Sequence, residues 1–168
     1  MTDLSALIKK LIDLGAAETS EIVGCTEKEI QQIESGIGAK LPLAYHEFLS
    51  RMGHSAGRLF VGTDIFFEHL PNLASGANRL LARDGKLFLP DRAFVFGMHQ
   101  GYQFTFFILD GTEKPIVNGY MEKSGFYRVA DSFSEFLSKA VEDTIHAEQT
   151  LSNRQKLVSD KRKKVFDN

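Results

Sequence analysis

The side chains best suited to metal or acid–base chemistry in this sequence are five histidines. They are His46, His54, His69, His99 and His146. No two of them have the H-x-x-x-H or H-E-x-x-H spacing, which would place two imidazoles on one face of a helix. A metal site would therefore have to be assembled by tertiary contacts, and the spacing predicts no metal ligands.

Cys25 is the single cysteine, so the chain forms no internal disulfide and no site with two cysteine ligands. It lies just before the expected start of a helix at Thr26, where the helix dipole can lower the pKa of a thiol. Because no histidine lies near it in the sequence, we interpret Cys25 as a small residue at the beginning of that helix.

Motifs for covalent or phosphate chemistry are absent from the sequence. It has no G-x-S-x-G motif, and the Gly36-Ile37-Gly38 segment follows an expected helix instead of a strand, so it does not fit a dinucleotide-binding or phosphate-binding loop. The carboxylates of Asp84, Asp91, Asp110 and Glu113 all fall in expected turns, where such residues are favoured for backbone reasons. We therefore predict no catalytic residues and no cofactor, and a protein that is not an enzyme.

Length and composition indicate one globular domain. A chain of 168 residues, 43% of them hydrophobic, can bury roughly two thirds of the surface that its unfolded form exposes. The first 21 residues alternate apolar and charged side chains, which fits neither a signal peptide nor a membrane span. Together with the single cysteine, this predicts a cytoplasmic protein.

Charge is distributed unevenly along the chain. Residues 152–168 contain six basic and two acidic side chains, a net charge of +4, which leaves −6 for residues 1–151 out of −2 for the whole chain. The basic side chains of this tail are Arg154, Lys156, Lys161, Arg162, Lys163 and Lys164. The tail is typical of a solvated helix end, with contact to a nucleic acid or a membrane as the alternative. The acidic remainder would attract a basic partner.

Two helices are expected between Thr26 and Met52. Thr26 and Glu29 have the capping-box spacing that begins a helix, and Pro42 suits the first turn of the next one. An earlier amphipathic helix is expected from Asp3 to Leu14. Ser132 and Glu135 repeat the capping box and predict a last helix.

Strands are expected in the middle of the chain. A short one is expected at Leu59 to Val61, before a helix over residues 72–83. Three longer runs rich in aromatic and β-branched residues span 93–98, 102–109 and 115–121 and predict consecutive antiparallel strands. Phe104 and Phe106 share one face of the second run and Phe107 lies on the other, so this sheet needs cover on both faces or a partner.

The order of these segments resembles the SMI1/KNR4 superfamily, also called SUKH, over roughly residues 26–141. The resemblance is carried by E-I-x-x-I-E, I-G-A-K-L-P-L-A-Y-H-E-F-L, the F-V-F-G strand, K-P-I-V and A-D-S-F-S-E-F-L. It implies an α+β fold with a single domain, in which a central, mainly antiparallel sheet of about four to six strands is packed by N-terminal helices and a C-terminal helix. The turn from Met52 to Gly57 departs from the N-G-G-like turn that is common in the family.

The resemblance also implies a function. Bacterial members bind and neutralise a cognate toxin, often a nuclease, whereas fungal members are regulatory interaction modules in cell-wall signalling. The hypothesis is therefore a non-catalytic immunity protein, and the alternative is a regulatory scaffold or small-ligand-binding module without a toxin partner. We expect an N-terminal helical extension at 1–25, the SUKH-like domain at 26–147 and a basic C-terminal helical tail at 148–168.

We expect the partner to be a protein, in particular a basic toxin domain, and neither a membrane nor a nucleic acid. Loops carry most binding residues in proteins. The polar and aromatic side chains of the expected loops are therefore candidate contacts. They are Asp64, Glu68, His69, His99, Gln100 and Tyr102.

Overall fold

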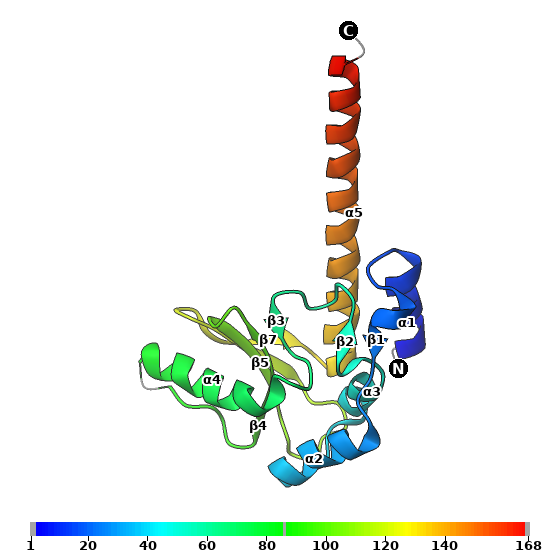
Figure 1. The fold of residues 1–168 in the computed structure, drawn as a ribbon. Coiled ribbons are helices and arrows are strands. Elements are labelled where there is room, and N and C mark those ends of the chain that lie inside the picture. Colours follow the sequence, from blue (N-terminus) through cyan, green and yellow to red (C-terminus); the bar gives the residue numbers. More distant parts are fainter. Residues whose placement is uncertain (1–2, 86, 167–168) are drawn as a thin grey trace.

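The computed structural model describes residues 3–85 and 87–166, with side chains through residue 156 (Figure 1). Its helices are α1 (Leu4–Asp13), α2 (Glu27–Ile37), α3 (Leu43–Met52), α4 (Leu70–Arg83) and α5 (Phe133–Phe166), with a 3-10 turn at Thr19–Glu21. The predicted α+β class, a single domain built on an antiparallel sheet, is confirmed.

The main sheet is a five-stranded meander in the order β3-β4-β5-β6-β7, and every neighbouring pair is antiparallel. Its strands are β3 (Thr63–Asp64), β4 (Ala93–His99), β5 (Gln103–Ile108), β6 (Val117–Met121) and β7 (Gly125–Ala130). A separate two-stranded sheet pairs β1 (Ile22–Val23) with β2 (Ser55–Ala56). The three long strands predicted from the sequence are β4, β5 and β6.

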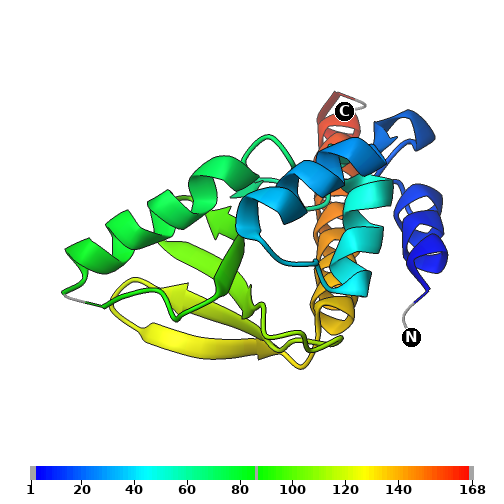
Figure 2. The ribbon, with the colours of Figure 1, turned by 90° about the horizontal axis from the view of Figure 1, so that it is seen from below.

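Both faces of the main sheet are covered, as the alternation in β5 predicts. Phe104 and Phe106 pack with Leu80 and other apolar residues of α4 in one core cluster. Phe107 faces the opposite side and belongs to the larger core under α3 and α5. Figure 2 shows α4 (green) lying along the sheet and the other helices grouped together on the right.

The larger core is organised around Tyr45 of α3, which is completely buried. Its ring centroid lies 5.4 Å from that of Phe107 on β5, 5.7 Å from Phe96 on β4 and 5.0 Å from Phe133 at the start of α5. The contacts with Phe107 and Phe133 are edge-to-face, the arrangement that the quadrupoles of aromatic rings favour. One side chain therefore joins a helix, two strands and the C-terminal helix.

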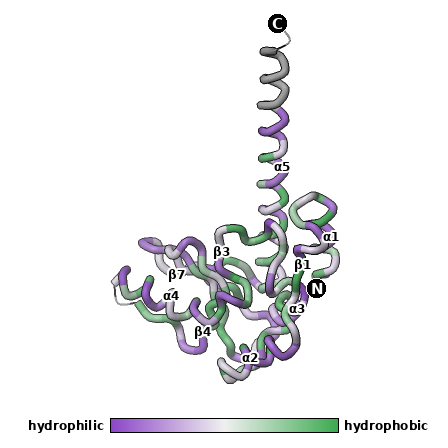
Figure 3. Tube along the Cα trace, viewed as in Figure 1, coloured by the Kyte–Doolittle hydropathy of each residue, from purple (hydrophilic) through white to green (hydrophobic). Residues whose placement is uncertain are grey.

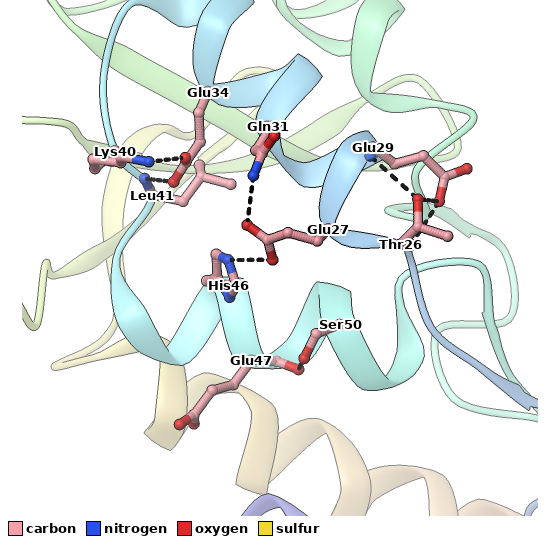
Figure 4. A network of polar contacts seen from close by, with 10 residues as sticks. All are labelled: Thr26, Glu27, Glu29, Gln31, Glu34, Lys40, Leu41, His46, Glu47 and Ser50. Carbon is pink, nitrogen blue, oxygen red and sulfur yellow. Dashed lines mark hydrogen bonds and ion pairs between the residues drawn. The ribbon is translucent and has the colours of Figure 1, made fainter.

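Polar contacts set the geometry of the α2–α3 pair (Figure 4). The predicted capping box is present: Glu29 donates its backbone N–H to Thr26 Oγ1, and the Glu29 carboxylate accepts from the Thr26 N–H. At the other end of α2, the buried Glu34 carboxylate accepts from the Leu41 N–H at 3.0 Å and from Lys40 Nζ at 2.7 Å. Burial acts to raise the pKa of Glu34, but these hydrogen bonds outweigh it and hold the pKa below its usual value.

The strand predicted at Leu59 to Val61 is wrong. This segment is a turn between β2 and β3, and Phe60 adopts a φ of 63° that no strand residue has. Two of its apolar side chains are explained by packing, because Leu59 is buried in the larger core and the Phe60 ring stacks on Phe136 of α5 at 5.9 Å. Val61 is 63% exposed, and the strand residues that form backbone pairs lie before and after this segment, in β2 and β3.

The last helix begins where the sequence predicts, with the Glu135 N–H donating to Ser132 Oγ at 3.2 Å. The Glu135 carboxylate accepts from the Asp131 N–H, one residue before the expected position. Helix α5 then continues away from the domain (Figure 1), and the coloured part of its projection in Figure 3 contains both hydrophilic and hydrophobic residues. The side chains of the basic cluster at residues 161–164 lie outside the described residues.

The C-terminal end of α4 is attached to the sheet by Asp84. Its carboxylate accepts hydrogen bonds from Tyr120 Oη on β6 and, at 2.7 Å, from the Lys123 N–H in the β6–β7 turn. These two hydrogen bonds, the one from Tyr120 first, lower the pKa of Asp84. The charged form of the carboxylate therefore stabilises the fold.

The buried hydroxyl of Tyr45 generates a first prediction, since its oxygen contacts no hydrogen-bonding partner among the described residues. An unpaired buried polar group costs about 1–3 kcal/mol. We expect Tyr45→Phe to raise the free energy of unfolding by about 1 kcal/mol, measured by urea denaturation. The control Tyr120→Phe, which removes a hydroxyl that does have a partner, should lower it. Destabilisation by Tyr45→Phe would contradict this reading of the core.

A second prediction concerns pH. Because the folded-state pKa of Asp84 lies below the ordinary value of 3.8, its contribution to stability is complete above that pH and is lost as the pH falls through the lower folded value. Asp84→Asn should therefore destabilise the protein at pH 7, and the difference from the wild type should shrink by pH 3.

Urea denaturation at both pH values measures this effect. The matched control is Asp91→Asn, at an exposed position whose side chain makes no hydrogen bond within the described part of the chain. An Asp84→Asn effect that is equally large at both pH values would contradict the assigned role.

Candidate functional site

The six candidate contact residues gather at one end and one edge of the main sheet, in two adjacent groups. Asp64 lies on the edge strand β3, and Glu68 and His69 follow it in the segment that leads into α4. His99 ends β4, and Gln100 and Tyr102 lie in the turn to β5. The groups are adjacent because β3 pairs with the end of β4, with Thr63 opposite His99 and Asp64 opposite Met98. We call these six residues the β3-edge surface.

The first group is acidic around a histidine. His69 Nε2 lies 3.7 Å from Asp64 Oδ1 and 3.5 Å from Glu68 Oε1. The Asp64 and Glu68 side chains are 62% and 76% exposed, so both carboxylates are available to an external partner. The arrangement presents two negative charges on the outside of an edge strand.

The second group is built on a tight turn. Gln100 and Gly101 have φ values of 46° and 74°, and the Tyr102 N–H donates to the His99 carbonyl at 3.2 Å, as in the turns that connect hairpin strands. Arg83 at the end of α4 donates to the Gly101 carbonyl at 3.1 Å and holds the turn against the domain. These hydrogen bonds stabilise the conformation of the turn and so orient the side chains on it.

His99 links the turn to β3. Its Nδ1 lies 2.9 Å from Thr63 Oγ1, and its ring lies edge-to-face with Tyr102 at a centroid distance of 5.7 Å. Tyr102 is 37% exposed, so part of this aromatic residue remains open to solvent. This combination of an oriented histidine and a half-exposed tyrosine is suited to recognition of another protein surface.

A cavity of about 290 Å³ lies beside the β3-edge surface, between the sheet and α5. Its polar lining comes from Thr63, His99, Gln103 and Thr105, and Phe60 and Phe136 are among its aromatic walls. Gly97 also lines it, at a register shift in the β4–β5 pairing. A Cβ at Gly97 would lie 2.7 Å from Thr105 Oγ1, so a larger residue there would force the Thr105 side chain to move.

Sequence reasoning missed a third group, formed by Cys25, Glu29 and His54. Their potential donor atoms lie within 4.8 Å of one another, and His54 Nε2 lies 3.1 Å from Glu29 Oε1. Cys25 does precede the first residue of α2, as expected, but a histidine that is distant in the sequence lies near it in space. The C-x-x-x-E spacing at the start of α2 was the available signal, but His54 follows 25 residues after Glu29 and reaches the pair only through the packing of α3 against α2.

Comparison with protein-family models assigns the chain to a family. The model described as SMI1 / KNR4 family (SUKH-1) matches residues 24–139, which run from the residue before Cys25 into α5. The chain belongs to the SMI1/KNR4 family. A search of curated proteins gave no match. The match includes all five strands of the main sheet and all six residues of the β3-edge surface.

Membership of the SMI1/KNR4 family supports a domain of the immunity-protein type in general, and with it a protein as the partner. The family consists in general of non-catalytic immunity proteins. Within the described residues, no helix has both the length and the apolar content that crossing a bilayer requires.

Proposed function

We propose that this SMI1/KNR4 protein is a cytoplasmic immunity protein that binds and neutralises a cognate bacterial toxin with a basic surface, such as a nuclease. The observation that carries the proposal is the β3-edge surface, where two exposed carboxylates lie next to a half-exposed tyrosine on a fixed turn. The surface needs no reaction of its own, because covering the toxin is sufficient to block it.

Electrostatics supports a basic partner. Residues 1–151 carry a net charge of −6, and Asp64 and Glu68 place part of that charge at the outer strand. Complementary charge raises the association rate of two proteins and disfavours partners of the wrong sign. A toxin that binds nucleic acid has a basic surface, so the same surface that contacts its substrate would be attracted to the β3 edge.

Packing supports an aromatic anchor within this surface. Binding energy usually concentrates in a few aromatic or arginine side chains that become fully buried in the complex. Tyr102 fits this role because the Arg83 contact and the His99 ring hold its turn in place before binding. Little conformational entropy would then be lost when the partner binds.

We also propose the division into an N-terminal extension at 1–25, a binding domain at 26–147 and a C-terminal tail at 148–168. Ile8 and Leu11 of α1 are buried in the larger core, so the extension contributes to stability as a cover of that core. The tail continues α5 beyond the domain, away from the sheet (Figure 1).

A small-ligand-binding or scaffold role is the second candidate, and the 290 Å³ cavity beside His99 favours it. The two functions predict different neighbouring genes. An immunity protein requires a neighbouring toxin gene, whereas an isolated gene would favour the scaffold or ligand-binding role.

The proposal is tested by co-expression with the toxin encoded next to this gene. We expect the protein to restore growth of cells that produce the toxin, and the two proteins to purify together as a complex. Failure of both rescue and co-purification would overturn the immunity function.

The contribution of the β3 edge is tested by reversing two charges. Asp64→Lys with Glu68→Lys should slow association with the toxin by at least about tenfold at low salt and flatten its salt dependence, because steering depends on screened charge. Stopped-flow or surface-plasmon-resonance measurements at several salt concentrations give both quantities.

The matched control is Asp91→Lys with Glu113→Lys. It changes the net charge by the same amount at exposed positions. Asp91 precedes β4 and Glu113 follows β5, so both lie toward the end of these strands that is farther from the His99 turn. If both double variants slow association equally, net charge alone acts and the β3 edge is not the contact surface.

A further inference from the structure

The group formed by Cys25, Glu29 and His54 combines three different donor types: a thiol, a carboxylate and an imidazole. Their donor atoms lie within 4.8 Å of one another, and the closest pair, His54 Nε2 and Glu29 Oε1, is separated by 3.1 Å. Donors around a tetrahedral zinc ion are separated by roughly 3.3–3.6 Å, given metal–ligand bonds of about 2.0–2.3 Å. Small side-chain movements are therefore sufficient to centre an ion between them.

The backbone that carries these donors is tied together across three segments. The Cys25 N–H donates to the Leu49 carbonyl of α3 at 2.8 Å, and the Gly53 N–H donates to the same carbonyl at 2.9 Å. The His54 N–H donates to the Val23 carbonyl at 2.9 Å. Cys25 and His54 are thus held on adjacent, hydrogen-bonded segments without any ion.

Gly53 makes the position of the thiol possible. A Cβ at this residue would lie 2.3 Å from Cys25 Sγ and 2.5 Å from the Leu49 carbonyl oxygen. The sulfur therefore lies directly against the backbone that leads into His54. This close approach brings the soft donor next to the imidazole.

The other two donors are oriented by neighbouring groups. Glu29 Oε2 accepts from the Thr26 N–H at 2.7 Å and from Thr26 Oγ1 at 2.9 Å, which leaves Oε1 facing His54. The ring of Phe67 lies edge-to-face with His54 at 5.3 Å. Such outer contacts fix the ligands of natural metal sites and raise their affinity.

Charge and accessibility are also suitable. A thiolate and a carboxylate together balance a divalent ion, although the positive end of the α2 dipole acts against any cation. Cys25 is 7% exposed, whereas the side chains of Glu29 and His54 are 28% and 35% exposed, so an ion can approach from one side. Burial, and the charge of Glu29 after it, raise the pKa of the free Cys25 thiol to about 11, so an ion that binds the sulfur has to displace its proton.

We propose that Cys25, Glu29 and His54 form a three-ligand site for a divalent transition-metal ion of the zinc type, with the fourth position open to water. The thiol loses its proton to solvent when the ion binds, and no redox change takes place. The site lies where the start of α2 meets the segment that follows α3, so the ion would link these two parts of the chain. The inference does not depend on the proposed toxin partner.

The test is a titration of the full-length protein with Co²⁺ in the absence of oxygen, followed by displacement with Zn²⁺. We expect one Co²⁺ per chain, with a thiolate-to-cobalt charge-transfer band and the intense visible bands of a four-coordinate ion. Zn²⁺ should abolish both and raise the melting temperature of the wild type. Absence of the charge-transfer band, or of any Zn²⁺ effect on melting, would overturn the proposal.

Variants identify the ligands. Cys25→Ser should abolish the charge-transfer band, and His54→Gln and Glu29→Gln should each weaken Co²⁺ affinity by at least about tenfold. The matched control is His46→Gln, because His46 Nε2 also lies near a carboxylate, 3.6 Å from Glu27 Oε2, but without a thiol. Unchanged affinity in both His54→Gln and Glu29→Gln would show adventitious binding to the cysteine alone and reject the site.

Circular dichroism of each metal-free variant establishes that it is folded. If Cys25→Ser does not fold, Cys25→Ala replaces it, and the wild-type melting shift with Zn²⁺ remains a test that needs no substitution.

Discussion

The packing of aromatic rings around Tyr45 is the interaction on which the rest of this structure depends. Helix α3, the strands β4 and β5 and the start of α5 meet at this one side chain, and rings from all of them lie within 6 Å of it. Edge-to-face contacts specify orientation as well as proximity. The aromatic cluster therefore determines how the N-terminal helices sit on the sheet and where α5 leaves the domain.

Burial of the sheet on both faces restricts where recognition can occur. Helix α4 covers one face and α3 with α5 covers the other, so most of the aromatic residues of β4 and β5 are committed to the two cores. The edge strand β3, the turn after β4 and the cavity beside them remain accessible. The other edge strand, β7, also exposes aromatic side chains, with Phe126 at 42% and Tyr127 at 36%, so recognition is left to the two edges of the sheet and to its turns.

The contacts between the start of α2 and the end of α3 serve both the fold and the proposed metal site. The capping box of Thr26 and Glu29 begins α2, and the same carboxylate turns its free oxygen toward His54. The Leu49 carbonyl receives both the Cys25 and the Gly53 N–H groups, which brings the two segments into contact. The hydrogen bonds that cap α2 and join it to the end of α3 already orient Glu29 and position Cys25 and His54, so the site needs no further secondary-structure element.

The sequence by itself determined the features that depend on neighbours along the chain: the capping boxes at Thr26 and Ser132, the alternation of Phe104 to Phe107, and the order of segments that indicates the family. It misassigned Leu59 to Val61, because an apolar run has the same pattern whether it pairs in a sheet or packs as a turn. Only the tertiary structure placed His54 beside Cys25, and Thr63 beside His99. Local hydrogen bonds and periodicity are encoded within a few residues, whereas these pairs form only after the aromatic core brings distant segments together.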